Sequence, residues 1–279
     1  MSESDPISLC LAGHISPPVM LARLVLLGYS NTAIRTMLRT RSGELLFFFE
    51  GRAEALDRMR TMLAAVSYEP GHGLVGIAAQ FDSAVLASPE ASVASYSLGD
   101  PSLLQAATAE IIGWLRAEAL FAPGMDVLDL GCGFGRVAAA LAPAAGSVLG
   151  LDISPRMIEE ARRRCGGLPK LRFAVTPGAD LAALPDSAFD LVLAVDSFPY
   201  LFQAGSCVAM SHIADSARVL RPGGSLVILN LAYGTDAQHW CQMTDMWAAE
   251  YDLAVILSGI RPFVLWDGAA FVARLTPAD

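Results

Sequence analysis

The sequence predicts an α/β protein with a doubly wound, mostly parallel β-sheet and a mainly helical N-terminal cap. From residue 126 onward, short apolar runs alternate with segments whose apolar residues recur at helical spacing. Near-continuous apolar strands separated by helices are typical of a parallel sheet that is covered on both faces. With 279 residues, the chain is long enough to bury a substantial core and to carry an additional region beside the main domain.

Five strands are expected in the second half of the chain. They are DVLDL, SVLGLD, LRFAV, FDLVLAVD and SLVILNL, at residues 126–130, 147–152, 171–175, 189–196 and 225–231. A helix is expected after Ser154, because a Ser-Pro pair suits the first helical turn and three arginines suit the last. Near the C-terminus, PFVLW and AAFVARL flank Asp267-Gly268, a pair that favours a two-residue hairpin turn. The sheet is therefore expected to end in an antiparallel strand.

Residues 1–75 are expected to form a helical cap or oligomerisation region, and residues 76–279 the main domain. Helices are predicted over 17–29, 32–39 and 52–68, a strand over ELLFFFEG (44–51), and a linker over EPGHGLVG (69–76). The two helices around GYSN resemble the opening of a helix-turn-helix unit, but no basic recognition face accompanies them. A cap or the surface of a homodimer is the favoured interpretation.

Composition and charge exclude several classes of partner. A formal net charge of −9 disfavours nucleic acid, because phosphate binding requires a basic surface. No run reaches the roughly 18 apolar residues that a membrane-spanning helix needs, and the acidic start MSESDPISL differs from a signal peptide. Five scattered cysteines without a CxxC pair favour reduced thiols. The sequence therefore predicts a cytoplasmic protein without a metal site.

The stretch VLDLGCGFGR (127–136) joins the first expected strand to a glycine-rich turn. A dinucleotide-binding turn has the spacing GxGxxG, whereas this turn has GxGxG with Arg136 in place of the third glycine. Asp129 precedes the turn, and a carboxylate there would repel a pyrophosphate. No GK[ST] follows, which excludes a Walker loop. The turn suits a cationic nucleoside without phosphate, such as S-adenosylmethionine.

Together with later segments, DLGCGFG resembles motif I of the class I S-adenosylmethionine-dependent methyltransferases. GLDIS, GADLAALP, AFDLVLAVDSF and ARVLRPGGSLVILN follow in the order of that family, and the resemblance covers residues from about 120 to 232. It implies a seven-stranded sheet and S-adenosyl-L-methionine as the cofactor.

The resemblance also implies roles for individual residues. In the family, an acid at the position of Asp152 accepts hydrogen bonds from the ribose hydroxyls, Ile153 would flank the adenine, and Asp180 would accept from the adenine amine. Two of these acids have ordinary interpretations as well, because Asp152 could cap the helix after Ser154 and Asp180 could be a turn acid. The expected cofactor-binding residues are Asp129, Gly131, Cys132, Gly133, Phe134, Gly135, Asp152, Ile153, Met157, Asp180, Leu181, Val195, Asp196 and Ser197.

Methyl transfer depends mainly on alignment and the exclusion of water, so no catalytic triad is expected. Asp196, Tyr200 and Asn230 stand at the carboxyl ends of the fourth and fifth strands, where doubly wound sheets bind ligands. His239 follows the fifth strand. Tyr96 lies in the stretch 88–105 that precedes the core helix, where the resemblance implies a lid tyrosine, with simple packing as the alternative. These five residues are the catalytic candidates.

Aromatic residues offer another type of contact, because a sulfonium is attracted to ring faces. Trp240, Met243 and Trp247 share one helical face, which either packs on the core or forms a wall of the binding site. The same contact could come from Phe134, which lies inside the glycine turn, and from Phe198, Tyr200 and Tyr233.

The sequence thus predicts an S-adenosylmethionine-dependent methyltransferase that acts on a small-molecule acceptor, in secondary metabolism. An alternative keeps the cofactor but changes the reaction: attack of the α-amine on the γ-carbon would give azetidine-2-carboxylate and methylthioadenosine. A non-enzymatic binding or regulatory protein is the third hypothesis.

Overall fold

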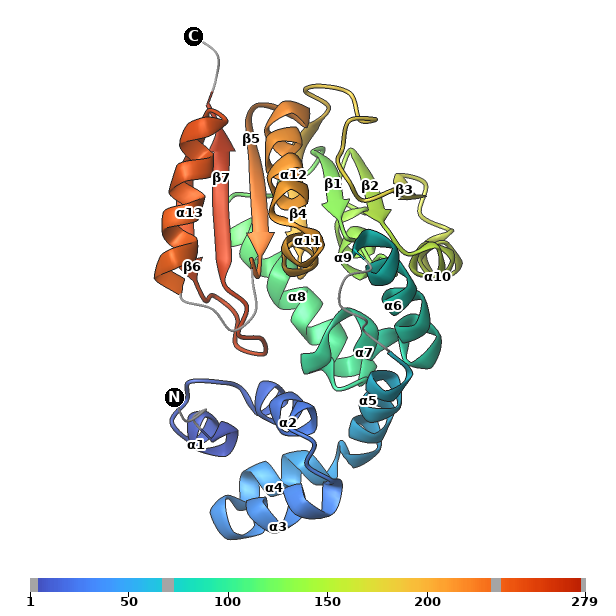
Figure 1. Ribbon diagram of the computed structural model, residues 1–279, viewed down its shortest axis with the longest axis vertical. Coiled ribbons are helices and arrows are strands. Elements are labelled where there is room, and N and C mark those ends of the chain that lie inside the picture. Colours follow the sequence, from blue (N-terminus) through green and yellow to red (C-terminus); the bar gives the residue numbers. More distant parts are fainter. Residues whose placement is uncertain (1–4, 67–72, 232–236, 277–279) are drawn as a thin grey trace. The chain divides into compact units, whose positions relative to one another are not determined.

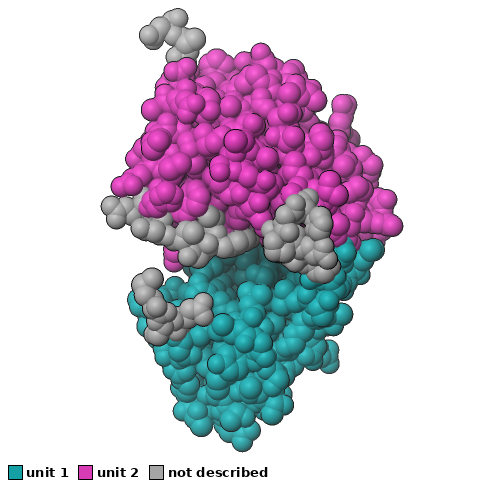
Figure 2. Space-filling view, in the orientation of Figure 1, with its two compact units in different colours: residues 1–67, 83–110, 263–267 teal, residues 68–82, 111–262, 268–279 magenta. Residues whose placement is uncertain are grey.

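The computed structural model describes residues 5–66, 73–231 and 237–276. The chain forms two compact units, which Figure 2 distinguishes by colour. One contains residues 1–67, 83–110 and 263–267, and the other contains residues 68–82, 111–262 and 268–279. Two helices, α6 (Gly73–Ala87) and α8 (Pro101–Ala117), contribute residues to both units.

Seven strands make up one sheet in the order β3-β2-β1-β4-β5-β7-β6. They are β1 (Asp126–Leu130), β2 (Ser147–Asp152), β3 (Leu171–Val175), β4 (Phe189–Val195), β5 (Leu220–Leu229), β6 (Leu253–Ile260) and β7 (Ala270–Leu275). β1 to β5 run parallel, and β7 is antiparallel to both β5 and β6. This confirms the predicted doubly wound, mostly parallel sheet with an antiparallel end. The bounds of β1, β2 and β3 coincide with the predicted ones.

Helices flank both faces of the sheet (Figure 1). They are α9 (Arg136–Leu141), α10 (Pro155–Cys165), α11 (Phe198–Ala204), α12 (Ser206–Val219), α13 (Ala237–Glu250) and the last part of α8. α10 begins as predicted, because the Ser154 hydroxyl accepts a hydrogen bond from the Met157 N–H at 3.0 Å and Pro155 occupies the first turn. The central strands β1 and β4 are buried along most of their length, as helices on both faces require.

The C-terminal hairpin was predicted in the wrong place. β7 pairs with β6, a strand that the sequence did not reveal, and residues 263–267 join the first unit instead of forming a strand. There the Ser16 hydroxyl donates to the Leu265 carbonyl at 2.8 Å, and Arg23 pairs with Asp267 at 2.8 Å. These long-range contacts override the local preference of Asp267-Gly268 for a tight turn.

β5 begins five residues earlier than its predicted start at 225. Its pairing with β4 shifts register between the pairs that contain Phe189 and Leu191, and Gly223 has a positive φ of 82°. The extra residues between Leu220 and Ser225 therefore form an irregularity within the strand, which the flexibility of glycine permits.

The first unit is helical, as predicted. It contains α1 (Pro6–Leu11), α2 (Pro17–Leu26), α3 (Asn31–Arg41), α4 (Gly43–Glu50), α5 (Ala53–Ala65), α7 (Pro89–Val93) and the 3-10 helix η1 (Ser95–Ser97). α2, α3 and α5 confirm the three predicted helices. The predicted linker over 69–76 lies partly outside the described residues, and its last four residues begin α6.

The strand predicted over 44–51 was wrong, because this segment is the helix α4. The Ser42 hydroxyl accepts a hydrogen bond from the Leu45 N–H at 3.2 Å and so caps the helix start. Leu45 and Phe49, four residues apart, are buried, whereas Phe47 between them is 83% exposed. This spacing suits one face of a helix, and the cap and packing outweigh the β-preference of three successive phenylalanines.

Candidate active site

The glycine turn after β1 lies where the strand order of the sheet reverses. β1 is flanked by β2 and β4, and ligands of open α/β sheets bind beyond the carboxyl ends of the strands at such a switch point. The N–H groups of Gly131 and Cys132 donate to the Leu151 carbonyl at 2.8 and 2.9 Å. The turn is thus fastened to the end of β2.

Two glycines of the turn lie where no side chain fits. Gly131 has φ +73°, and a Cβ on it would lie 2.4 Å from the Cβ of Ser197. Gly135 has φ +83°, and a Cβ there would lie 2.4 Å from the Phe173 ring. Any other residue would meet both backbone strain and a clash. The close approach at Gly131 brings the turn against the segment that follows β4.

Asp152, the last residue of β2, ties the turn to the start of α10. Its carboxylate accepts hydrogen bonds from the N–H of Gly133 at 2.8 Å and from the N–H of Ser154 at 2.9 Å. Burial of this side chain raises the pKa of Asp152 to about 6. A carboxylate offers about four lone-pair sites, so two backbone donors leave capacity for hydroxyl groups of a ligand.

Asp129, within β1, is a second buried acid beside the turn. Only 2% of it is exposed, and its carboxylate accepts a hydrogen bond from the Ala138 N–H at 3.1 Å. Burial raises the pKa of Asp129 to about 7, and the nearby Arg136 opposes that rise. The site therefore contains two acids that a bound cation would stabilise in their ionised forms.

Asp196 and Asn230 meet at the ends of β4 and β5. The Asn230 side-chain amide donates to the Asp196 carboxylate at 2.7 Å. Both residues have left-handed backbone conformations, with φ of 58° and 70°. Such conformations cost energy in residues other than glycine and are frequent at functional sites. The preceding residue Val195 is half-buried and pairs with Leu229 of β5.

Residues of α6 reach the same edge of the sheet, which the sequence analysis missed. The Phe81 ring packs edge-on against Tyr200 with centroids 4.8 Å apart. The Asp82 carboxylate accepts hydrogen bonds from the Ser154 hydroxyl at 2.5 Å and from the Arg156 N–H at 3.0 Å. The helix is apolar on several sides, so its sequence alone does not indicate which residues face the site.

The residues expected near the adenine lie in the loop after β3 and at the start of α10. A Cβ on Gly178 would lie 2.7 Å from Ile153 Cδ1, so this loop packs directly against Ile153. Leu181 is buried, whereas Asp180 is exposed and accepts a hydrogen bond from the Ala182 N–H at 3.1 Å. The turn-acid interpretation of Asp180 is therefore realised, and its exposed carboxylate still has lone pairs for a ligand.

Three further residues expected at the cofactor are also buried. Met157 packs inside the protein, and burial raises the pKa of the Cys132 thiol well above its ordinary value. Phe134 is also buried, with the Arg164 guanidinium 4.3 Å from its ring centre. The Phe134 ring thus binds a cation of the protein itself.

The remaining candidates belong to other elements or lie outside the described residues. Tyr96 belongs to the first unit, where its ring stacks on Trp266 at 5.4 Å. His239 is exposed on α13, with its ring edge-on to Trp240. Tyr233 lies outside the described residues.

The tryptophan face of α13 packs on the core. Phe202 of α11 lies 4.9 Å from Trp240 and 5.7 Å from Trp247, measured between ring centres. Met243 packs against the same core cluster. These contacts favour the packing interpretation of this stripe.

The residues at the turn fit S-adenosylmethionine. The Ser197 hydroxyl is buried and lacks a hydrogen-bond partner among the described residues. It would lie 3.2 Å from a Cβ on Gly131, directly beside the turn. A polar group at this position and two buried acids suit a cationic ligand with polar ends. In the described part of the chain, no group of three or more His, Cys, Asp or Glu could hold a metal ion, and no helix has the length and apolar character needed to cross a membrane.

Comparison with known proteins yields a family model and several relatives. Residues 127–224 match the family model of a methyltransferase domain. A demethylmenaquinone methyltransferase from Tropheryma whipplei is 37% identical over 110 residues, which cover 39% of this chain and 43% of the relative. An S-adenosyl-L-methionine-dependent Diels-Alderase from Talaromyces variabilis is 30% identical over 133 residues, which cover 46% of this chain and 42% of the relative. The matches span less than half the length of these relatives.

Solved structures are similar as well. The magnesium protoporphyrin IX methyltransferase from Synechocystis PCC 6803, determined with bound SAH, has 19% sequence identity and a TM-score of 0.47, over 63% of this chain and 84% of that chain. The chain therefore contains a methyltransferase domain over residues 127–224, which include the glycine turn, and its cofactor is S-adenosyl-L-methionine.

Proposed function

We propose that this protein transfers a methyl group from S-adenosylmethionine to a small-molecule acceptor, in secondary metabolism. The observation that carries the proposal is the glycine turn at the switch point of the sheet, with the Asp196–Asn230 pair at the ends of the next two strands. In this proposal the turn serves the cofactor and the pair serves the acceptor. The net charge of −9 supports a small molecule rather than nucleic acid as the acceptor.

The cofactor contacts of this proposal follow the strand ends. Asp152 accepts from the ribose hydroxyls, Ile153 and Asp180 meet the nucleobase, and Ser197 lies beside the methionine end. When bound, S-adenosylmethionine supplies a methyl group that its sulfonium has already activated for displacement. The protein therefore has to align the acceptor and exclude water rather than activate the methyl group.

Asp196 is the candidate for proton acceptance from the acceptor. The Asn230 amide holds one of its oxygens at 2.7 Å and so orients the carboxylate. General base catalysis by such a group contributes typically about 10²- to 10⁴-fold to a rate. Tyr200, which Phe81 holds edge-on, is the candidate wall of the acceptor site.

We further propose that residues 1–75 form a cap or oligomerisation region beside a cofactor-binding domain over 76–279, and that the protein is a homodimer. Exposed apolar side chains on its helices, Leu26 and Phe47 among them, support this part of the proposal. Light scattering on the purified protein tests it, since a monomeric mass at micromolar concentration would exclude a stable dimer.

One specific observation favours a second function, in which the cofactor is bound but its methyl group is not transferred. The relative from Talaromyces variabilis is named as an S-adenosyl-L-methionine-dependent Diels-Alderase. A non-methylating lyase or cyclase, such as one that forms azetidine-2-carboxylate and releases methylthioadenosine, belongs to the same class of alternatives.

Product analysis separates these functions. The protein is incubated with S-adenosylmethionine, alone and with quinols, phenols and amines, and nucleoside products are identified by mass spectrometry. S-adenosylhomocysteine that forms only with an acceptor supports the proposal. Methylthioadenosine without acceptor would support the lyase or cyclase instead. The D196N variant is the control, because we expect it to slow acceptor turnover while the fold is retained.

A further inference from the structure

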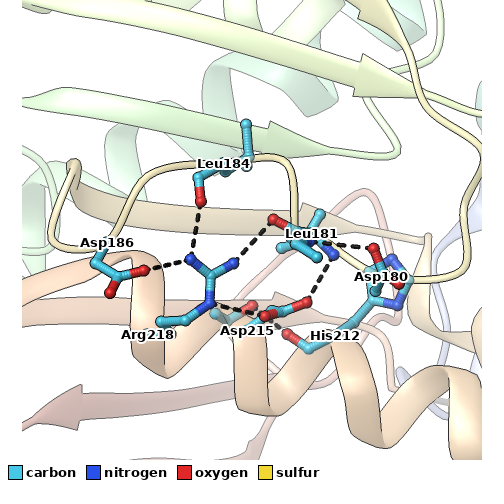
Figure 3. Close-up of polar contacts among 9 residues, drawn as sticks. Asp180, Leu181, Leu184, Asp186, His212, Asp215 and Arg218 are labelled. Atoms are coloured by element: carbon cyan, nitrogen blue, oxygen red, sulfur yellow. Dashed lines mark hydrogen bonds and ion pairs between the residues drawn. The ribbon is translucent and has the colours of Figure 1, made fainter.

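A single arginine of α12 holds the loop between β3 and β4 at several points (Figure 3). The Arg218 guanidinium donates to the carbonyls of Leu181 and Leu184 at 2.9 and 2.8 Å, and it pairs with Asp186 at 2.5 Å. Its Nε donates to Asp215, one turn earlier on α12, at 2.9 Å. The planar fork of arginine is suited to such simultaneous contacts, whereas a lysine could not reproduce them.

Asp215 also holds Leu181 by a hydrogen bond. One Asp215 oxygen accepts from Arg218, and the other accepts from the Leu181 N–H at 2.7 Å. The N–H of Leu181 is thus held by Asp215 and its carbonyl by Arg218. We call these two side chains the α12 clamp.

The clamped loop is irregular, so its shape depends on individual contacts. Residues 176–188 contain no helix or strand, so their backbone groups need partners outside regular structure. The loop starts at the carboxyl end of β3, the edge at which open α/β sheets bind ligands, and Gly178 packs against Ile153. Asp180 directly precedes the clamped residue and is exposed.

We propose that Asp215 and Arg218 are positioning residues that set the nucleobase selectivity of the site. The clamp fixes Leu181 and thereby positions the carboxylate of Asp180 beside it. This carboxylate then accepts a hydrogen bond from an amino group of the base. An ionised carboxylate only accepts hydrogen bonds, so it favours a purine with an amino group and disfavours one with a carbonyl at the same position. This inference rests on the proposed function for the identity of the ligand, S-adenosylmethionine.

The test compares two ligands that differ at one position of the base. Isothermal titration calorimetry measures the dissociation constants of S-adenosylhomocysteine and S-inosylhomocysteine, which carries a carbonyl in place of the adenine amine. For R218Q we expect the affinity for S-adenosylhomocysteine to fall about tenfold, the effect of roughly one charge-assisted hydrogen bond. The affinity for S-inosylhomocysteine should stay within about twofold, so the selectivity ratio falls.

Arg221 provides a matched control. It also bridges two acids, Asp190 at 2.7 Å and Asp126 at 2.9 Å. These acids lie at the amino ends of β4 and β1, whereas the proposed binding site lies at the carboxyl ends of the strands. R221Q should therefore leave both dissociation constants unchanged. If R218Q does not fold, R218K and D215N test the same point, and each should reduce the selectivity ratio by a smaller factor.

The outcomes separate this inference from the proposed function. A folded R218Q with an unchanged selectivity ratio, or one that weakens both ligands equally, would overturn the inference alone. A wild-type protein that binds neither ligand would overturn both. Hydrogen exchange of the ligand-free protein adds a direct check, since the Leu181 amide should exchange faster in R218Q and D215N than in R221Q.

Discussion

The side-chain amide of Asn230 donates a hydrogen bond of 2.7 Å to the carboxylate of Asp196, and both residues adopt left-handed backbone conformations. The pair joins the ends of β4 and β5, beside the switch point of the sheet. Two strained residues in contact are retained where their geometry is needed, which makes this pair the first target for substitution.

Replacement of Asn230 separates its backbone role from its side-chain role. N230G keeps the left-handed backbone without strain but loses the amide, whereas N230A loses the amide and keeps the strain. We expect both variants to lower kcat about tenfold, and N230A to be less stable than N230G by about 1 kcal/mol. Urea unfolding and steady-state kinetics measure these effects. Equal stability of the two variants would show that the backbone at Asn230 is not strained.

Substitution of Gly131 should abolish cofactor binding. G131A introduces a Cβ that would lie 2.4 Å from the Cβ of Ser197, at a position where φ is positive. We expect a loss of stability of about 1 to 3 kcal/mol and no measurable binding of S-adenosylhomocysteine by calorimetry. The double variant G131A/S197G removes the clash and should recover part of the stability. G113A in α8 is the control, because nothing lies within 4 Å of its new Cβ and alanine favours a helix.

The stability of the protein should depend on pH through Asp129. Burial raises the pKa of Asp129 from 3.8 to about 7, so between these pH values the folded protein binds more protons than the unfolded chain. The protonated Asp129 side chain stabilises the folded protein relative to its ionised form. This contribution is complete below pH 3.8 and is lost as the pH rises through about 7. The stability of wild type relative to D129N should thus fall by on the order of 2 kcal/mol from pH 5 to pH 8.

D152N serves as a comparison for this experiment. Burial raises the pKa of Asp152 to about 6, so its contribution should be lost over a lower pH range than that of Asp129. Unfolding curves at several pH values distinguish the two variants. A pH-independent difference between wild type and D129N would contradict the expected titration.

Asp82 should stabilise the start of α10. Its carboxylate accepts hydrogen bonds from the Ser154 hydroxyl and the Arg156 N–H. Loss of such a helix cap lowers the free energy of unfolding by about 1 kcal/mol. We expect D82A to be destabilised by this amount and to lower the pKa of Asp152, because a neighbouring negative charge is removed. D82N retains an acceptor oxygen and should be intermediate. E159A, which removes an exposed ion pair from the same helix, should change little.

The role of Tyr96 can be decided by a pair of variants. Y96F keeps the ring that stacks on Trp266, so we expect a kcat within about twofold of wild type if packing is its role. Y96A should be destabilised by about 3 to 5 kcal/mol, as for other buried aromatic residues. A folded Y96F whose kcat falls more than tenfold would instead assign the hydroxyl to the reaction.

The sheet was predictable because its central strands β1 and β4 are buried along most of their length. β1, β2 and β3 are short apolar runs between turns, and such runs have few alternative structures. The position of 263–267 was not predictable, because its partners Ser16 and Arg23 are more than 200 residues away in the chain. The helix over 44–51 was obscured by three phenylalanines, whose local preference is for a strand.

The candidate site was predictable to the extent that its residues follow strand ends. Asp196 and Asn230 were found in this way, since the ends of parallel strands meet at one edge, whereas Asp152 was found from the resemblance to the methyltransferase family. Asp82 and Arg218 were not, because their contacts depend on the path of a helix and of an irregular loop. Side chains that bond backbone groups far away in the chain leave no periodic pattern in the sequence.

The burial of Asp129 also affects how well phosphorylated nucleotides compete with the cofactor for the glycine turn. Asp129 repels a phosphate group at the glycine turn only while its carboxyl group is ionised. Since its pKa is about 7, a large share of the molecules lacks that charge near neutrality. Discrimination against phosphorylated competitors should therefore weaken on acidification, even though every contact of the turn stays in place.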